Sequence, residues 1–289
     1  KSKLELENMW PDILFAVKAK NLTLELDENL ADKALKAAEE KIKHKKMKKL
    51  FVAALALGVV LIGSDVKANI TDKEPSKDHS YVENDPASII ENYIKAVGGK
   101  ANVEKIKNSV LLMEAEFQGA TIVIKGISDQ VNSRMLQETS VMGNVAQKTV
   151  LVNGKGKISG MGQEQELTEE MVSMLKAQTY VFPEMHYKDL GYTMEVQGTE
   201  IINDEDANKL IITAPNGMKT VEYYSVASGL KLRTSSDAAG DITYMDYSEI
   251  DGVKIPMRLS IKNPMLPVAL EAKMVSMKFN QELSDEDFK

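Results

Sequence analysis

Alternation of apolar and polar residues dominates the chain from Leu111 onward. Apolar positions from Leu111 to Phe117 alternate with the acids Glu114 and Glu116, and Gly119 is placed to turn the chain back into a second strand. A period of two is typical of a β-strand with one buried face, so this stretch predicts a hairpin. The same pattern predicts further strands at 134–142, 145–152, 155–161, 192–197, 209–213, 219–226, 230–235, 242–250, 253–262 and 268–280.

Turn-forming residues separate these predicted strands. Asn153-Gly154, Ser228-Gly229 and Asp251-Gly252 supply residues that accept the positive φ of a tight hairpin turn. About eleven short strands joined in this way predict an antiparallel meander, which curls because twist accumulates from strand to strand. The predicted fold class is mainly β (α+β), with a curved antiparallel sheet that forms a half-open β-barrel.

One helix is expected just before the strands. Asp85 suits the N-cap, Pro86 the first helical position and Gly98-Gly99 the stop. The apolar residues between them form one stripe, so this helix must pack against an apolar surface. A second, short helix is expected at 102–107.

A further helix interrupts the strand pattern at 167–178. Thr168 suits its N-cap, and Met171, Met174 and Leu175 share one face. We expect this helix and the N-terminal one to cover the open side of the sheet. The pattern leaves open whether they enclose a hydrophobic cavity or a filled core.

The stretch 47–68 has the three parts of an export signal. Lys48 and Lys49 form a basic start, an apolar run follows at 50–63, and Val66-Lys67-Ala68 is a small-residue exit. The apolar run is shorter than the roughly 18 residues that span a bilayer. We therefore predict a signal peptide cleaved after Ala68 and a periplasmic location; a short signal anchor is the alternative. Both place the chain from Asn69 onward outside the inner membrane.

The flanking segments complete the expected domain organisation. Residues 1–46 are interpreted as an upstream extension that is not part of the native mature protein; the rival view makes the helical pattern at 30–42 a cytoplasmic segment before a signal anchor. Residues 69–86 are polar and predict a flexible leader. One domain is expected at 87–289, because no Pro- or Gly-rich linker interrupts it.

Composition narrows the possible partners. The chain has a formal net charge of −7, and from Asn69 onward 33 acidic residues face 23 basic ones. Such an acidic surface repels phosphate backbones, which argues against a nucleic-acid partner. The absence of cysteine excludes disulfides, thiolate metal sites and a lipid-modified N-terminal cysteine. We expect a monomer that is not lipid-anchored.

The motifs favour a protein that is not an enzyme. G-x-S-x-G, a P-loop, G-x-G-x-x-G, HEXXH and HXXEH do not occur in the sequence. His44, His79 and His186 are too scattered for a metal-ligand set, and His186 is interpreted as a packed or surface residue. The acidic runs at 203–206 and 284–287 are interpreted as solvated turns. No cofactor and no metal are predicted.

Methionine is concentrated in the strand region. Fourteen of the sixteen methionines lie between Met113 and Met277. Methionine fills irregular cores, and it is also common on surfaces that fit several apolar partners. Both a filled barrel core and a lipid-fitting lining remain open at this point.

Several stretches together resemble one family. LVNGKGKIS at 151–159, TAPNGMKTVEYYSVASGLKLRTSS at 213–236, DITYMDYSEIDGVKIPMRLSI at 241–261 and LSDEDF at 283–288 resemble the LolA-like superfamily of outer-membrane lipoprotein carriers and sorting proteins. The resemblance covers 87–289, and IDGVKIPMRL at 250–259 is its best local piece. It implies a periplasmic half-open barrel with helices as a lid, whose apolar cavity holds acyl chains of a lipoprotein or another lipid.

The sequence departs from that family at one position. In the lipoprotein carrier an arginine before the strand near Val131 helps to hold the lid closed, but this chain has Asp129-Gln130 there. Arg134 is the nearest substitute. The sequence looks closer to a branch whose domain occurs alone or attached to envelope zinc peptidases.

Two functions of different class follow. The first is a periplasmic carrier of lipid or lipoprotein acyl chains, with transient membrane contact and possible donor and acceptor proteins of the envelope. The second is a non-catalytic envelope interaction module with a filled core, associated with an envelope peptidase or assembly factor. The residues expected to line the carrier's cavity are Met113, Phe117, Ile122, Ile124, Leu151, Met171, Met174, Leu175, Tyr180, Phe182 and Met185.

Overall fold

The computed structural model describes residues 85–160, 162–237, 240–263 and 268–289. All of these belong to one of the two compact units into which the chain divides, Val52–Lys289. The predicted extension at 1–46, the signal peptide at 47–68 and nearly all of the leader at 69–86 lie outside the described residues. No helix within the described ranges is long and apolar enough to cross a membrane.

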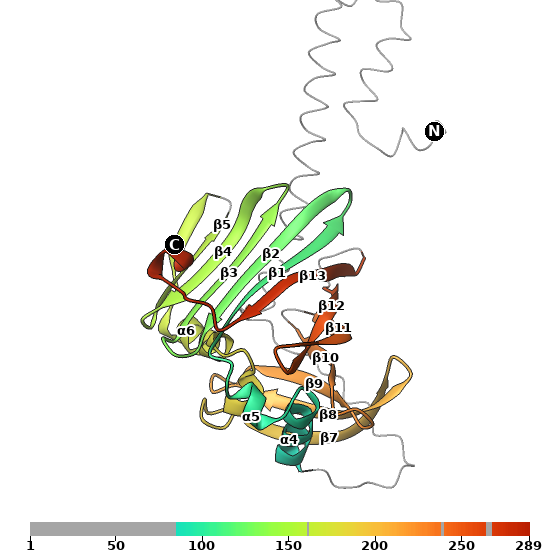
Figure 1. Ribbon diagram of the computed structural model, residues 1–289. Coiled ribbons are helices and arrows are strands. Elements are labelled where there is room, and N and C mark those ends of the chain that lie inside the picture. Colours follow the sequence, from blue (N-terminus) through green and yellow to red (C-terminus); the bar gives the residue numbers. More distant parts are fainter. Residues whose placement is uncertain (1–84, 161, 238–239, 264–267) are drawn as a thin grey trace, which may run out of the picture. The chain divides into compact units, whose positions relative to one another are not determined.

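The described chain is built on one antiparallel sheet of 13 strands. Its order is β6-β5-β4-β3-β2-β1-β13-β12-β11-β10-β9-β8-β7, so it ends at β6 and at β7 without closing. Figure 1 shows the sheet curving between these edges. The predicted fold class is confirmed. The strands are β1 (Asn108–Phe117), β2 (Ala120–Asp129), β3 (Arg134–Val141), β4 (Asn144–Val152), β5 (Lys155–Gly160), β6 (Gln163–Glu166), β7 (Thr193–Ile202), β8 (Glu205–Thr213), β9 (Lys219–Ser225), β10 (Lys231–Ser236), β11 (Gly240–Ile250), β12 (Val253–Lys262) and β13 (Leu270–Phe279).

The hairpin turns use the chemistry that the sequence predicts. Asn153 and Gly154 have φ of 53° and 72°, and Asp251 and Gly252 have φ of 50° and 82°. Positive φ at both central residues matches the right-handed twist of the strands that they join. These turns connect β4 to β5 and β11 to β12.

The first helices lie close to the expected positions. Helix α4 (Pro86–Ala96) begins with Pro86, as expected. Asp85 precedes it at the N-cap position, but the Asp85 side chain makes no capping hydrogen bond. Helix α5 (Lys100–Val103) begins two residues earlier than predicted and has only four residues. The amide of Asn102 on α5 donates to the Gly98 carbonyl at 3.0 Å, which ties the two helices together.

The mid-chain helix is shorter than predicted. Thr168 caps α6 (Glu169–Leu175) as expected, and its Oγ1 accepts from the backbone N–H of Met171 at 3.3 Å. The chain then tightens into the 3₁₀ turn η1 (Lys176–Thr179) instead of continuing as an α-helix. A second 3₁₀ turn, η2 (Pro183–His186), follows in the aromatic loop.

The two main helices lie on the same face of the sheet. Leu151, which packs with α6, pairs directly with Met135, and the pairing continues through Ser128 and Ser109 to Phe279, which packs with α4. Directly paired residues share a face. We call this the inner face and the opposite one the outer face.

The outer face receives the end of the chain. Phe288 on the 3₁₀ turn η3 (Asp285–Phe288) packs with Ile127 and Leu136. The Arg134 guanidinium lies 4.4 Å from the Phe288 ring centroid and donates to Asp285 at 2.8 Å. This arginine therefore secures the C-terminal segment on the outer face, whereas the family resemblance implies a lid contact.

A second ion pair of Arg134, with the buried Asp129, makes the structure sensitive to acid. Asp129 accepts from Arg134 at 2.7 Å and from the Asn132 side chain at 2.9 Å. Burial raises the pKa of Asp129, but the hydrogen bonds from Asn132 and Arg134 outweigh it and lower the pKa below the ordinary value.

A lowered pKa of Asp129 adds stability above the pKa of the unfolded chain, about 3.9. That contribution is lost as pH falls through the folded value. We expect Asp129→Asn to destabilise the protein at pH 7 and to differ much less from the native protein near pH 2, measured by urea unfolding. Asp206→Asn, at an exposed position, is the control. An Asp129→Asn penalty that stays constant with pH contradicts the assignment.

Candidate ligand-binding site on the inner face

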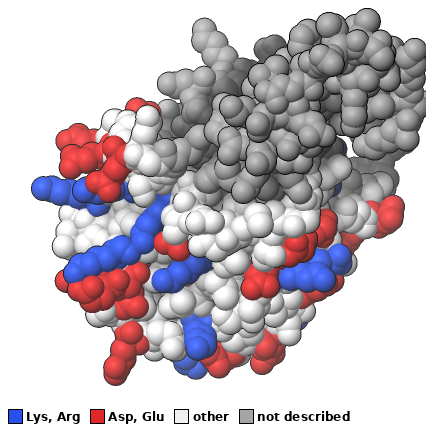
Figure 2. Space-filling model, turned by 90° about the horizontal axis from the view of Figure 1, so that it is seen from above, with Lys and Arg blue, Asp and Glu red and all other residues white. Residues whose placement is uncertain are grey.

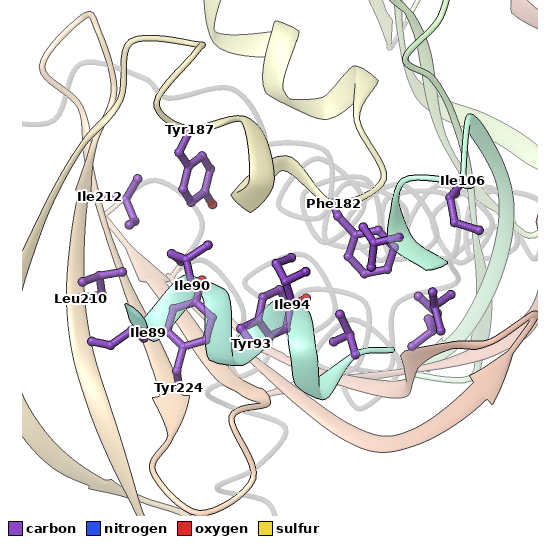
Figure 3. Packing of buried hydrophobic residues seen from close by; sticks show 14 of the residues in the cluster. Ile89, Ile90, Tyr93, Ile94, Ile106, Phe182, Tyr187, Leu210, Ile212 and Tyr224 are labelled. Atoms are coloured by element: carbon purple, nitrogen blue, oxygen red, sulfur yellow. The ribbon is translucent and has the colours of Figure 1, made fainter. Parts of the chain in front are cut away.

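The part of the inner face beneath α4 is filled by side chains. Ile89, Ile90, Tyr93 and Ile94 point from the helix into one cluster with residues of β8, β9, β12 and β13 (Figure 3). These helix residues are at most 8% exposed. The stripe predicted from the sequence is therefore the seam between α4 and the sheet.

A buried ionic network joins the aromatic loop to this part of the sheet. The Lys231 ammonium on β10 lies 2.5 Å from Glu184 on η2 and 2.8 Å from Glu222 on β9. Glu222 also accepts from the Tyr187 hydroxyl at 2.9 Å and from the Tyr224 hydroxyl at 2.5 Å. Both η2 and the residue that follows it are thus tied to the strands by charge-assisted hydrogen bonds.

The environment fixes the protonation of these groups. Burial alone lowers the pKa of Lys231, but Glu184 and Glu222 outweigh this and hold the pKa above its ordinary value. Burial, followed by the charges of Glu222 and Glu184, raises the pKa of Tyr187 and Tyr224 well above the usual range. The lysine therefore stays charged, and the two tyrosines stay protonated as donors.

Helix α6 covers a second part of the inner face. Val172 and Leu175 pack with Met135 on β3 and Leu151 on β4, and Leu167 lies against them. Leu175 and Leu151 are each 1% exposed. The Ser128 hydroxyl of β2 also donates to the Gln178 carbonyl at 2.8 Å, which fixes the end of this segment to the sheet.

The inner face continues as apolar rows beyond α6. The strand pairing aligns Met274, Met113 and Ile124 in one row, and Ala272, Ala115 and Ile122 in the next. Met113 is 4% exposed and Ile122 is 0% exposed. These rows offer unbranched and branched apolar side chains side by side, which suits a flexible hydrocarbon ligand.

The predicted lining residues fall into three groups in the structure. The first group lies on the inner face of β1, β2 and β4, the second belongs to α6, and the third lies in the aromatic loop. Met171 and Met174 are only partly buried. The groups are Met113, Phe117, Ile122, Ile124 and Leu151; then Met171, Met174 and Leu175; and then Tyr180, Phe182 and Met185.

The third group lies apart from the apolar rows. Phe182 and Met185 pack with the α4 cluster and line a small pocket of about 320 Å³, together with Lys107, Gln130 and His186 among others. The pocket is at the lower end of the size range of ligand pockets, and its walls combine polar and apolar side chains. The structure thus places the first group on the sheet and packs Leu175 of the second group against it. It places Phe182 and Met185 of the third group beside α4 and α5.

His186 behaves as a packed residue. Its ring stacks on Tyr180, with ring centroids 4.0 Å apart. Burial lowers the pKa of His186, and Asp189 opposes this shift. The described residues contain no group of three or more His, Cys, Asp or Glu residues that could hold a metal ion.

Two polar side chains stand on the same face as the apolar rows. Thr139 on β3 pairs directly with Ile124 on β2 and with Gln147 on β4. Thr139 is 1% exposed and Gln147 is 3% exposed. They extend the row of Met113 and Ile124 with hydrogen-bonding groups.

Sequence reasoning missed these polar residues and the ionic network. Lys231, Glu184 and Glu222 are 9 to 47 positions apart, and only the sheet brings them together. Thr139 and Gln147 had one available signal: both occupy positions that the strand alternation assigns to the buried face. The remaining surface carries charges of both signs, which Figure 2 shows interspersed on one face.

No protein-family model and no curated protein matches the chain. Solved structures with a similar fold include a DUF1329 family protein from Desulfovibrio piger, at 13% identity and a TM-score of 0.47 over 71% of this chain and 98% of that one. A proposed outer membrane lipoprotein-sorting protein domain from Vibrio parahaemolyticus has 16% identity and a TM-score of 0.48, over 71% and 97% of the two chains. A LolA superfamily protein from Nitrosomonas europaea has 13% identity and a TM-score of 0.47, over 71% and 97%.

Two of these structures, the lipoprotein-sorting protein domain and the LolA superfamily protein, carry names that match the superfamily that the sequence resembles. At identities of 16% or less, these likenesses concern the fold. The function proposed below therefore rests on this chain's own residues.

Proposed function

We propose that the protein is an exported, non-catalytic carrier that holds acyl chains of lipids or lipoproteins on the inner face of its sheet, in the periplasm. The observation that supports this is the set of apolar rows on β1, β2 and β13, next to the α6 cluster. Met274, Met113 and Ile124 form one row and Ala272, Ala115 and Ile122 the other. These side chains are largely shielded from water in the folded chain. In this proposal α6 is the cover that moves to admit a cargo.

Burial of hydrocarbon supplies the binding energy in this proposal. Each methylene removed from water contributes about 0.8 kcal/mol, so a chain of ordinary length binds tightly even after the cost of moving α6. The short cluster beneath α6 suits such movement, because it comprises four buried residues and Leu167. The larger cluster beneath α4 stays in place and holds the sheet together.

Native mass spectrometry tests the carrier proposal. The protein is produced from the full chain, purified from the periplasm, weighed under native conditions and then denatured for lipid analysis. We expect one acylated species bound at close to one per protein. A bare mass, together with no uptake of added palmitoyl lipid, contradicts the proposal.

A second function is favoured by a different observation. The inner face beneath α4 is already filled, and the buried network of Lys231, Glu184 and Glu222 fixes the aromatic loop there. A fully packed inner face suits a non-catalytic interaction module that binds an envelope peptidase or assembly factor through its outer surface. The bare mass described above is the result that this alternative predicts.

A further inference from the structure

Thr139 and Gln147 form a polar pair inside an otherwise apolar row. They lie directly opposite each other on β3 and β4, and the row continues through Ile124 and Met113 to Met274. Next to Gln147 on the other side is Gly160 of β5, which contributes no side chain. One end of the row is therefore hydrocarbon and the other end can form hydrogen bonds.

The pair has unused hydrogen-bonding capacity. Thr139 Oγ1 and Gln147 Oε1 are buried and make no hydrogen bond within the part of the chain that the structure describes. A buried polar atom without a partner costs about 1 to 3 kcal/mol, so such atoms are rare unless something else satisfies them. Elsewhere on the inner face, Glu222 shows the opposite situation, because both of its oxygens accept hydrogen bonds.

The two atoms complement one particular chemical group. The Thr139 hydroxyl can donate to a carbonyl oxygen, and Gln147 Oε1 can accept from an N–H. A secondary amide presents one carbonyl and one N–H. An ester or a tertiary amide presents the carbonyl alone and leaves Gln147 Oε1 without a partner.

We propose, resting on the carrier function above, that Thr139 and Gln147 bind the secondary amide of an amide-linked acyl chain whose hydrocarbon lies along Ile124, Met113 and Met274. The amide carbonyl accepts from Thr139 Oγ1, and the amide N–H donates to Gln147 Oε1. The cargo class is thereby narrowed from any acyl lipid to an N-acylated one.

Three matched probes test this recognition. N-methylpalmitamide has the carbonyl and the N–H, whereas N,N-dimethylpalmitamide and methyl palmitate have the carbonyl without the N–H. Binding is measured by displacement of a fluorescent fatty-acid probe from the full-chain protein purified from the periplasm. We expect the secondary amide to bind about fivefold to tenfold more tightly than the other two, which corresponds to one net hydrogen bond.

Two substitutions separate the two hydrogen bonds. Gln147→Leu should weaken the binding of the secondary amide only, so that the three probes then bind with similar affinity. Thr139→Val should lower the affinity for all three probes by a similar factor, because each probe presents a carbonyl to the Thr139 hydroxyl. Gln163→Leu and Thr193→Val, on the exposed edge strands, are the matched controls and should keep the native order.

Thermal unfolding without ligand excludes a merely structural effect. Because each substitution removes an unpaired buried polar atom, Gln147→Leu and Thr139→Val should be at least as stable as the native protein. A marked loss of stability in both overturns the inference, since it shows that the polar atoms have structural partners. Equal binding of the three probes to the native protein overturns it as well but leaves the carrier function standing, whereas failure of every probe to bind overturns both.

Discussion

Lys231→Ala is expected to lower the free energy of unfolding by about 3 to 5 kcal/mol, because it removes one member of a buried ionic network. Lys231 is 6% exposed and lies between Glu184 and Glu222, which are 7% and 4% exposed. Without the ammonium, two carboxylates face each other in a site shielded from water. Urea unfolding at pH 7 measures the loss.

Two further variants serve as controls for Lys231→Ala. Lys254→Ala removes an exposed lysine and should change stability by less than about 0.5 kcal/mol. The triple variant Lys231→Met, Glu184→Gln and Glu222→Gln keeps the volume of the network and removes its charge, and it should be much closer to the native protein than the single variant. A Lys231→Ala protein as stable as the Lys254→Ala control contradicts the role assigned to the network.

Local features of the chain were predictable wherever a short motif decides the backbone. Pro86 starts α4, Thr168 caps α6 and Asn153-Gly154 turns β4 into β5, as the sequence predicts. Each of these motifs acts through the φ angle or the hydrogen bonds of its own neighbours. Alternation then gave the sheet, because a strand with one buried face repeats every two residues.

Features without a local pattern were missed or misplaced. Strand β6 (Gln163–Glu166) has four exposed polar residues, so its pairing with β5 leaves no hydrophobic signal. The C-terminal turn η3 is held by Phe288 and by Asp285, whose partner Arg134 is 151 residues away. Such elements are specified by tertiary contacts that no window of sequence contains.

In the candidate site, too, some features follow from a local sequence pattern and others depend on tertiary contacts. Burial of Met113, Ile122 and Ile124 follows from the strand period and the expected sheet. We expect residues of the aromatic loop to line the cavity, and in the structure the ion pair of Glu184 and Lys231 ties this loop to the sheet next to the α4 cluster. An alternating pattern reports which face a strand residue occupies, and it carries no such information for a loop.

Leu175→Glu is the substitution expected to separate an acyl-chain carrier from a filled interaction module. Leu175 ends α6 and is 1% exposed among Met135, Leu151 and Val172. A carboxylate cannot remain charged in that apolar cluster without a partner, so α6 should leave the sheet. In a carrier the sheet should persist, because the cluster beneath α4 shares no residue with the cluster beneath α6.

In a carrier, Leu175→Glu should abolish uptake of palmitoyl lipid while circular dichroism still reports the β-sheet and thermal unfolding stays cooperative. In a filled module the same change should unfold the domain, since a large-to-small change alone at such a core position costs about 2 to 5 kcal/mol. Lys176→Glu places the same charge on the next, exposed residue and should affect neither property. A folded Leu175→Glu protein that still takes up lipid at the native level contradicts the role of α6 as the cover of the ligand site, because its departure then has no consequence for binding.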